Sequence, residues 1–91
     1  MGLDVVEIVM AVETTFQIEV PVESTADLWR GRNDIQVRDF VAMIVDLVKQ
    51  QNPAYEGDVV DMTRRIISEF AGSPFSLVSI DALFKHDLNL I

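Results

Sequence analysis

Residues 35–51, which read IQVRDFVAMIVDLVKQQ, decide the fold class of this chain. The large apolar side chains in this stretch recur every three or four positions, which is the spacing of one face of an α-helix. They are Val37, Phe40, Val41, Ile44, Leu47 and Val48. Pro53 follows shortly afterwards and cannot continue a helix. We therefore predict one long helix at residues 35–51 that buries this apolar stripe.

Helical spacing is also present near the N-terminus, at residues 3–16. Val6, Val9 and Met10 follow that spacing along the stretch. Asp4 places a negative charge in the first turn, where it favours the helix dipole. These features predict a second long helix at residues 3–16.

A third helix is predicted at residues 59–70. It follows Asp58, a residue type that caps helix N-termini through its side-chain oxygen. Gly72 and Pro74 mark its end. By helical spacing we expect its inward-facing side chains to be Val59, Met62, Ile66 and Phe70.

The segments between these helices are shorter and more polar. Residues 18–20 are expected to be extended, because a residue that precedes a proline, here Pro21, avoids the helical region. One short helix is expected around residues 24–29 and a turn of helix near residues 81–84, while residues 52–57 are the best linker candidate. The predicted fold class is therefore all-α, a small helical bundle with three main helices and one or two short ones.

Length and composition limit what this bundle can be. The 91 residues suffice for a single domain, 1–91, and 49% of them are apolar, which is typical of a globular chain. Fifteen acidic residues against seven basic ones give a net charge of −8. Such a surface repels nucleic-acid phosphates and anionic lipids, and it favours the basic surface of a partner protein. We expect a protein partner and neither a nucleic-acid nor a membrane role.

Cysteine is absent from the sequence, which excludes disulfides, thiolate metal sites and cysteine nucleophiles. No apolar run is long enough to span a bilayer, and no basic segment followed by an apolar one indicates a secretory signal. These features favour a cytoplasmic protein.

Candidate catalytic and metal-ligating residues are few. His86 is the only histidine and has Asp87 beside it, but no nucleophile accompanies the pair, and a surface or capping role is the better interpretation. Asp4, Glu7 and Glu13 have no spacing typical of a calcium loop. We expect no catalytic residue, no metal site, no cofactor and no enzymatic activity.

Residues 3–21, LDVVEIVMAVETTFQIEVP, carry a resemblance to a known family. They look like the second helix of acyl carrier proteins, which reads leucine-aspartate, then valine-glutamate-leucine-valine-methionine, an acid-rich turn, phenylalanine and isoleucine-proline. The match runs without a gap. Residues 35–48 are similar to the last helix of the same family.

The C-terminal part resembles the family in an unexpected position. Residues 66–70, IISEF, resemble the end of the family's first helix, and residues 78–88, VSIDALFKHDL, resemble the loop that follows it. In ordinary carriers this piece precedes the helix that residues 3–16 resemble. The chain therefore resembles an acyl carrier protein in circularly permuted order, with the old ends joined through residues 52–57. The resemblance implies an acyl-carrier-protein-like bundle with permuted connectivity.

The same alignment bears on the family's prosthetic group. Carriers attach phosphopantetheine to a serine in an aspartate-serine-leucine motif, and Gly2 stands at the serine position here. Glycine has no hydroxyl that could form a phosphodiester. The resemblance therefore implies a chain without the phosphopantetheine cofactor.

What the resemblance implies about function is protein recognition in acyl or polyketide metabolism. Carriers meet their partners at positions that correspond here to Leu3, Asp4, Glu7, Met10 and Glu13. The partners that the resemblance implies are acyl-processing enzymes with basic surfaces. Thr14 and Thr15 replace acids that are common in the family, so the docking charge is weaker.

Two alternatives remain open from the sequence. One is an active carrier whose serine is supplied by another chain or by a longer native protein. The other is a helical protein that binds an acyl chain or lipid. Because the linker at residues 52–57 is short, both a monomer and a dimer that swaps its C-terminal piece are compatible with the sequence.

Overall fold

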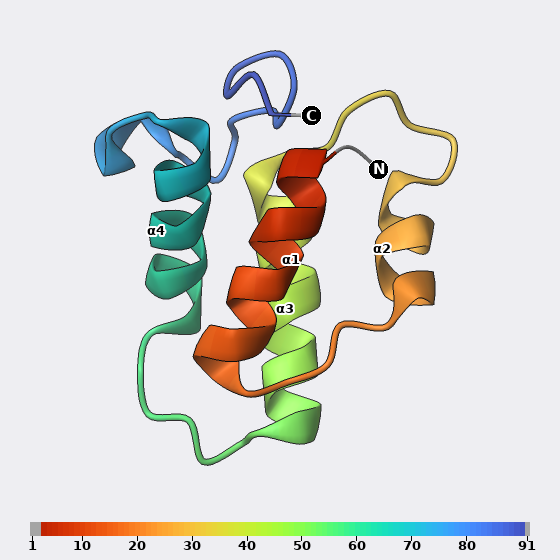
Figure 1. Ribbon diagram of the computed structural model, residues 1–91, viewed down its shortest axis with the longest axis vertical. Coiled ribbons are helices and arrows are strands. Elements are labelled where there is room, and N and C mark those ends of the chain that lie inside the picture. Colours follow the sequence, from red (N-terminus) through yellow and green to blue (C-terminus); the bar gives the residue numbers. More distant parts are fainter. Residues whose placement is uncertain (1–2, 91) are drawn as a thin grey trace.

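The computed structural model describes residues 3–90 and is all-helical, which confirms the predicted fold class. Its elements, in chain order, are α1 (Leu3–Phe16), α2 (Val22–Trp29), α3 (Val37–Gln51), α4 (Val59–Ala71) and the 3₁₀ turn η1 (Phe75–Leu77). The described residues contain no strand, and a single bridge pairs Gln36 with Leu83. Figure 1 shows α1, α3 and α4 running lengthwise through the molecule, with the shorter α2 at one side.

Helix α3 supplies much of the core, as its sequence predicts. All six residues of its apolar stripe are buried. The helix begins at Val37, two residues later than expected, because the preceding backbone pairs with the C-terminal segment. The N–H of Phe84 donates to the carbonyl of Ile35 over 3.0 Å, and the N–H of Val37 donates to Ala82 over 2.8 Å. A capping box between Gln36 and Asp39 then satisfies the first turn of α3.

Helix α1 has the expected bounds, but its core residues are not the ones whose spacing predicted the helix. The side chains that enter the core are Val5, Ile8, Val12 and Phe16. Val6 and Val9 are only partly buried and Met10 is exposed, so their spacing was no guide to the core. Apolar residues surround most of the circumference of this helix, and therefore periodicity alone does not identify its inner face.

Helix α4 packs against both α1 and α3 and has the predicted ends. The carboxylate of Asp58 accepts from the N–H of Asp61 over 3.0 Å, and Gly72 ends the helix with a φ of +66°, which favours glycine. Its buried side chains are Thr63, Ile66 and Ile67. The expectation that Phe70 faces inward is wrong, because the ring lies at the edge of the contact with α1 and is exposed.

The connection between α1 and α2 has no helix at residues 18–20, and its two apolar side chains are buried. The side-chain amide of Gln51 exchanges two hydrogen bonds of 2.7 Å with the backbone of Glu19. Asn52 adds a bond of 2.9 Å from its Nδ2 to the carbonyl of Phe16. The end of α3 thereby holds the end of α1 in place.

The C-terminal segment folds back over the start of α3. Residues 81–84 do not form the predicted turn of helix, because their backbone pairs with residues 35–37. The turns of this segment follow directly after it, where the N–H of Asp87 donates to the carbonyl of Leu83 over 3.0 Å. Asp34 anchors it by accepting from the N–H groups of Lys85 and His86 over 2.9 and 3.0 Å. Partial burial acts to raise the pKa of Asp34, but these two donors, the N–H of Ile35 and the charge of Lys85 together bring that pKa below its ordinary value.

Candidate functional site

Most of the predicted partner-binding residues lie together on the outer face of α1. Leu3, Glu7 and Met10 fall at helical spacings of four and three residues and so share one face. The side chain of Leu3 is 68% exposed and that of Met10 is 60% exposed, and Glu7 is exposed between them. Asp4 is partly buried on the first turn, beside this face. The structure therefore presents two large apolar side chains on either side of a carboxylate.

Glu13 does not belong to this face. Its Oε2 accepts a hydrogen bond of 2.9 Å from the N–H of Val20 and is partly buried. This bond links the last turn of α1 to the segment before α2. Glu13 therefore links two helices through one of its carboxylate oxygens.

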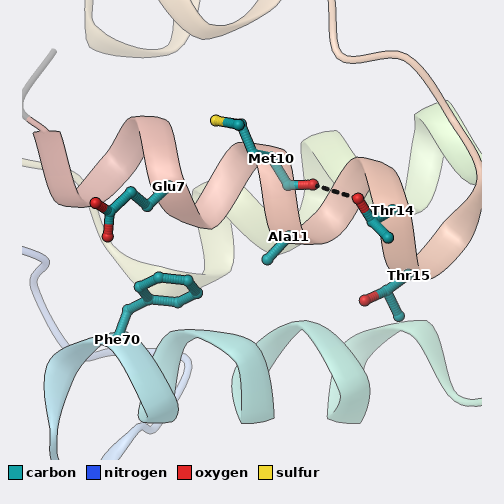
Figure 2. A pocket seen from close by; sticks show the side chains of 6 residues that line it. All are labelled: Glu7, Met10, Ala11, Thr14, Thr15 and Phe70. Atoms are coloured by element: carbon teal, nitrogen blue, oxygen red, sulfur yellow. Dashed lines mark hydrogen bonds between the residues drawn. The ribbon is translucent and has the colours of Figure 1, made fainter.

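A shallow groove of about 460 Å³ runs beside the face, between α1 and α4. Its lining consists of Glu7, Met10, Ala11, Thr14 and Thr15 from α1 and Phe70 from α4. Figure 2 shows the ring of Phe70 reaching from α4 toward α1 near Glu7 and Ala11, whereas the side chain of Met10 points away from α4. The groove is wide open to solvent.

The described lining of this groove contains one ionisable side chain, the carboxylate of Glu7. Helix α1 contains no lysine or arginine. Within residues 3–90 the carboxylate of Glu7 has no hydrogen-bond or ion-pair partner. Thr14 is already engaged, because its hydroxyl donates to the carbonyl of Met10 over 3.1 Å. An apolar surface with one unpaired carboxylate at its rim can accept an apolar side chain and a cation together.

The groove adds residues that sequence reasoning did not assign to the site. Phe70 was expected in the core, and its actual position depends on how α4 is rotated against α1. Thr14 and Thr15 drew attention in the sequence only because they replace acids that are common in carriers. Ala11 carries no such pattern, and its helical spacing from Glu7 was the only available signal.

The remaining candidates have structural surroundings. His86 is exposed, and its Nε2 lies 4.0 Å from the carboxylate of Asp87. Asp87 itself accepts from the N–H of Leu83 over 2.8 Å and so closes a turn. The described part of the chain contains no group of three or more histidine, cysteine, aspartate or glutamate side chains that could hold a metal ion. Gly2, which the resemblance aligns with the serine of carriers, lies outside the described residues.

No protein-family model matches the chain, and comparisons with curated proteins and with solved structures found no significant similarity. Between Leu3 and Leu90, no helix has the length and apolar character that crossing a bilayer requires.

Proposed function

We propose that this chain is a non-covalent protein-interaction module of the acyl carrier type, which binds the basic surface of an acyl-processing enzyme through the outer face of α1. The observation that carries the proposal is the exposure of Leu3 and Met10 on either side of the unpaired carboxylate of Glu7. Nothing in this proposal requires a prosthetic group on the chain itself.

Physical chemistry favours an interface at this face. Large apolar side chains grouped on a surface and bordered by polar groups are typical of protein-binding sites. The net charge of −8 draws a positively charged partner toward the molecule and speeds encounter. Apolar contact then supplies affinity, while the carboxylate fixes orientation.

The packing of the C-terminal segment supports the carrier-type part of the proposal. In the permuted order this segment takes the place of the loop that leads into the α1 helix, so its apolar residues should be buried against α1. Phe84 and Leu88 are buried, and the ring of Phe84 lies beside Phe40 of α3 and Trp29 of α2. The segment and the first turn of α1 lie at the same end of the molecule in Figure 1, which is what the permuted order requires. Residues 52–58 connect α3 to α4 at the opposite end.

Binding to a carrier-processing enzyme with a basic docking surface, such as a ketosynthase, tests the proposal. Glu7→Lys should weaken binding, and so should added salt, because both reduce the attraction between the two charged surfaces. Loss of one exposed charge contributes about 1 kcal/mol at most, and reversal adds repulsion, so we expect a decrease in affinity of about tenfold. The matched control is Glu56→Lys, which changes an exposed glutamate in the loop between α3 and α4.

The result is decisive in both directions. A dissociation constant that rises for Glu7→Lys and not for Glu56→Lys supports the α1 face. Equal effects of the two variants, or no binding by the wild-type chain to any such enzyme, would refute the proposal.

A further inference from the structure

We propose that the groove between α1 and α4 receives an apolar side chain from a basic amphipathic helix of the partner, with a lysine or arginine of that helix on Glu7. This inference rests on the proposed function and deepens it, because it makes α4 part of the docking surface. Phe70 then acts as an apolar anchor that comes from the far end of the sequence.

The shape of the groove favours a side chain of a protein over a small molecule. Small-molecule pockets enclose most of their ligand and so remove it from water. Here the volume of about 460 Å³ is open along its length, so a free ligand would remain largely solvated. A side chain held by its own backbone binds such a site more readily, because the rest of its interface covers the opening.

The two walls of the groove specify what should enter it. Ala11 leaves space on the α1 side, and Phe70, which is 36% exposed, presents its ring from the α4 side. An apolar side chain placed there would cover the ring of Phe70 and remove more of it from water. That burial is favourable in proportion to the apolar area covered.

The charge of the groove indicates which ionisable residue the partner helix should carry beside its apolar side chain. Glu7 is the only ionisable residue in the described lining, and it has no partner within residues 3–90. A partner helix that carried an acid beside its apolar anchor would meet repulsion, whereas a lysine or arginine would form an ion pair. The furrow between two helices running alongside each other also suits a third helix, whose side chains form ridges that fit grooves of this kind.

The probe for this inference is a fluorescein-labelled peptide of about 18 residues, long enough to form a helix, with leucine on one face and lysine on the other. Its binding to the full chain is measured by fluorescence anisotropy. The decisive variant is Thr15→Arg, which places bulk and positive charge in the groove at an exposed helical position. Its matched control is Gln50→Arg, an equal change of charge at an exposed position of α3 outside the groove.

We expect Thr15→Arg to weaken peptide binding about tenfold or more, as loss of a central interface anchor does, and Gln50→Arg to change it much less. Phe70→Ala should act in the same direction, with Leu77→Ala as its control, because Leu77 is exposed but lies outside the groove. Circular dichroism establishes that each variant is folded. If Phe70→Ala fails to fold, the comparison of Thr15→Arg with Gln50→Arg tests the inference by itself.

Other results would overturn the inference. They are equal effects of the two arginine variants, equal binding of a leucine–glutamine peptide, or absence of peptide binding. Self-association of the chain that Thr15→Arg abolishes would assign the groove to a second copy instead. If Glu7→Lys weakens enzyme binding while Thr15→Arg leaves both enzyme and peptide binding unchanged, the proposed α1 interface is supported and the proposed role of the groove is refuted. If Thr15→Arg weakens peptide binding while Glu7→Lys leaves enzyme binding unchanged, the proposed function is refuted and the groove remains a binding site for a basic helix.

Discussion

Phe84→Ala should be among the most destabilising single substitutions in this chain. The ring of Phe84 is 0% exposed, and its centroid lies 5.6 Å from that of Phe40 and 6.1 Å from that of Trp29. Its backbone N–H donates to the carbonyl of Ile35 and its own carbonyl accepts from the N–H of Leu90. Removal of the ring leaves a cavity where the C-terminal segment meets α2 and α3.

The expected loss of unfolding free energy is about 3–5 kcal/mol, the usual range for truncation of a buried phenylalanine. That is a large part of the roughly 5–15 kcal/mol that stabilises a domain. Urea denaturation measures it, and Trp29, the only tryptophan, reports unfolding by fluorescence from beside the altered site. With a denaturant slope of about 1–2 kcal/mol/M, the midpoint should fall by about 1.5 M or more.

Leu77→Ala is the control for this measurement, because Leu77 is 64% exposed in the same C-terminal part of the chain. Its stability should stay within about 0.5 kcal/mol of the wild type. A loss below about 1 kcal/mol for Phe84→Ala would refute the reasoning, since a ring whose removal leaves stability nearly unchanged cannot fill the core.

Three further outcomes are expected. Thr63→Val should leave stability unchanged or raise it by about 1 kcal/mol, because the buried hydroxyl has no partner among residues 3–90; a clear loss in denaturation would show that the hydroxyl is satisfied. The pKa of Asp34 is lower in the folded than in the unfolded chain, so its charged form stabilises the fold. The difference in unfolding free energy between wild type and Asp34→Asn should therefore be constant well above the ordinary pKa of about 3.9 and should shrink as pH falls below that value. A difference that does not depend on pH would contradict this. A phosphopantetheinyl transferase with coenzyme A should leave the mass unchanged, because Gly2 has no hydroxyl; a gain of one phosphopantetheine arm would contradict the alignment with carriers.

The helices could be predicted from the sequence where one face differed clearly from the others. In α3 the apolar residues form a single stripe, and all of them are buried as expected. The ends of α4 follow from local chemistry, since Asp58 supplies a capping carboxylate and Gly72 supplies a positive φ. These signals act within a few residues of the backbone that they shape, so they can be interpreted without knowledge of the tertiary structure.

The remaining features depend on contacts between distant segments. The exposure of Phe70 depends on how α4 is rotated against α1, and local spacing does not encode that rotation. The bond from the N–H of Val20 to Glu13 gives a predicted docking residue a structural contact that local spacing did not indicate. Residues 82–84 bond to residues 35–37, about 45 positions away, and this pairing replaces the expected helical turn. The candidate site was therefore partly predictable on α1 and not predictable on α4.

The most direct test of the account is an NMR titration of the ¹⁵N-labelled chain with a basic carrier-processing enzyme. If the module binds through the outer face of α1, the largest changes in amide shift or intensity should cluster at Leu3, Glu7 and Met10, and at Phe70 if the groove is occupied. Gln50, on α3 and outside the groove, should change little. Changes centred on α3, or no change at concentrations where the enzyme binds its usual carriers, would contradict the account.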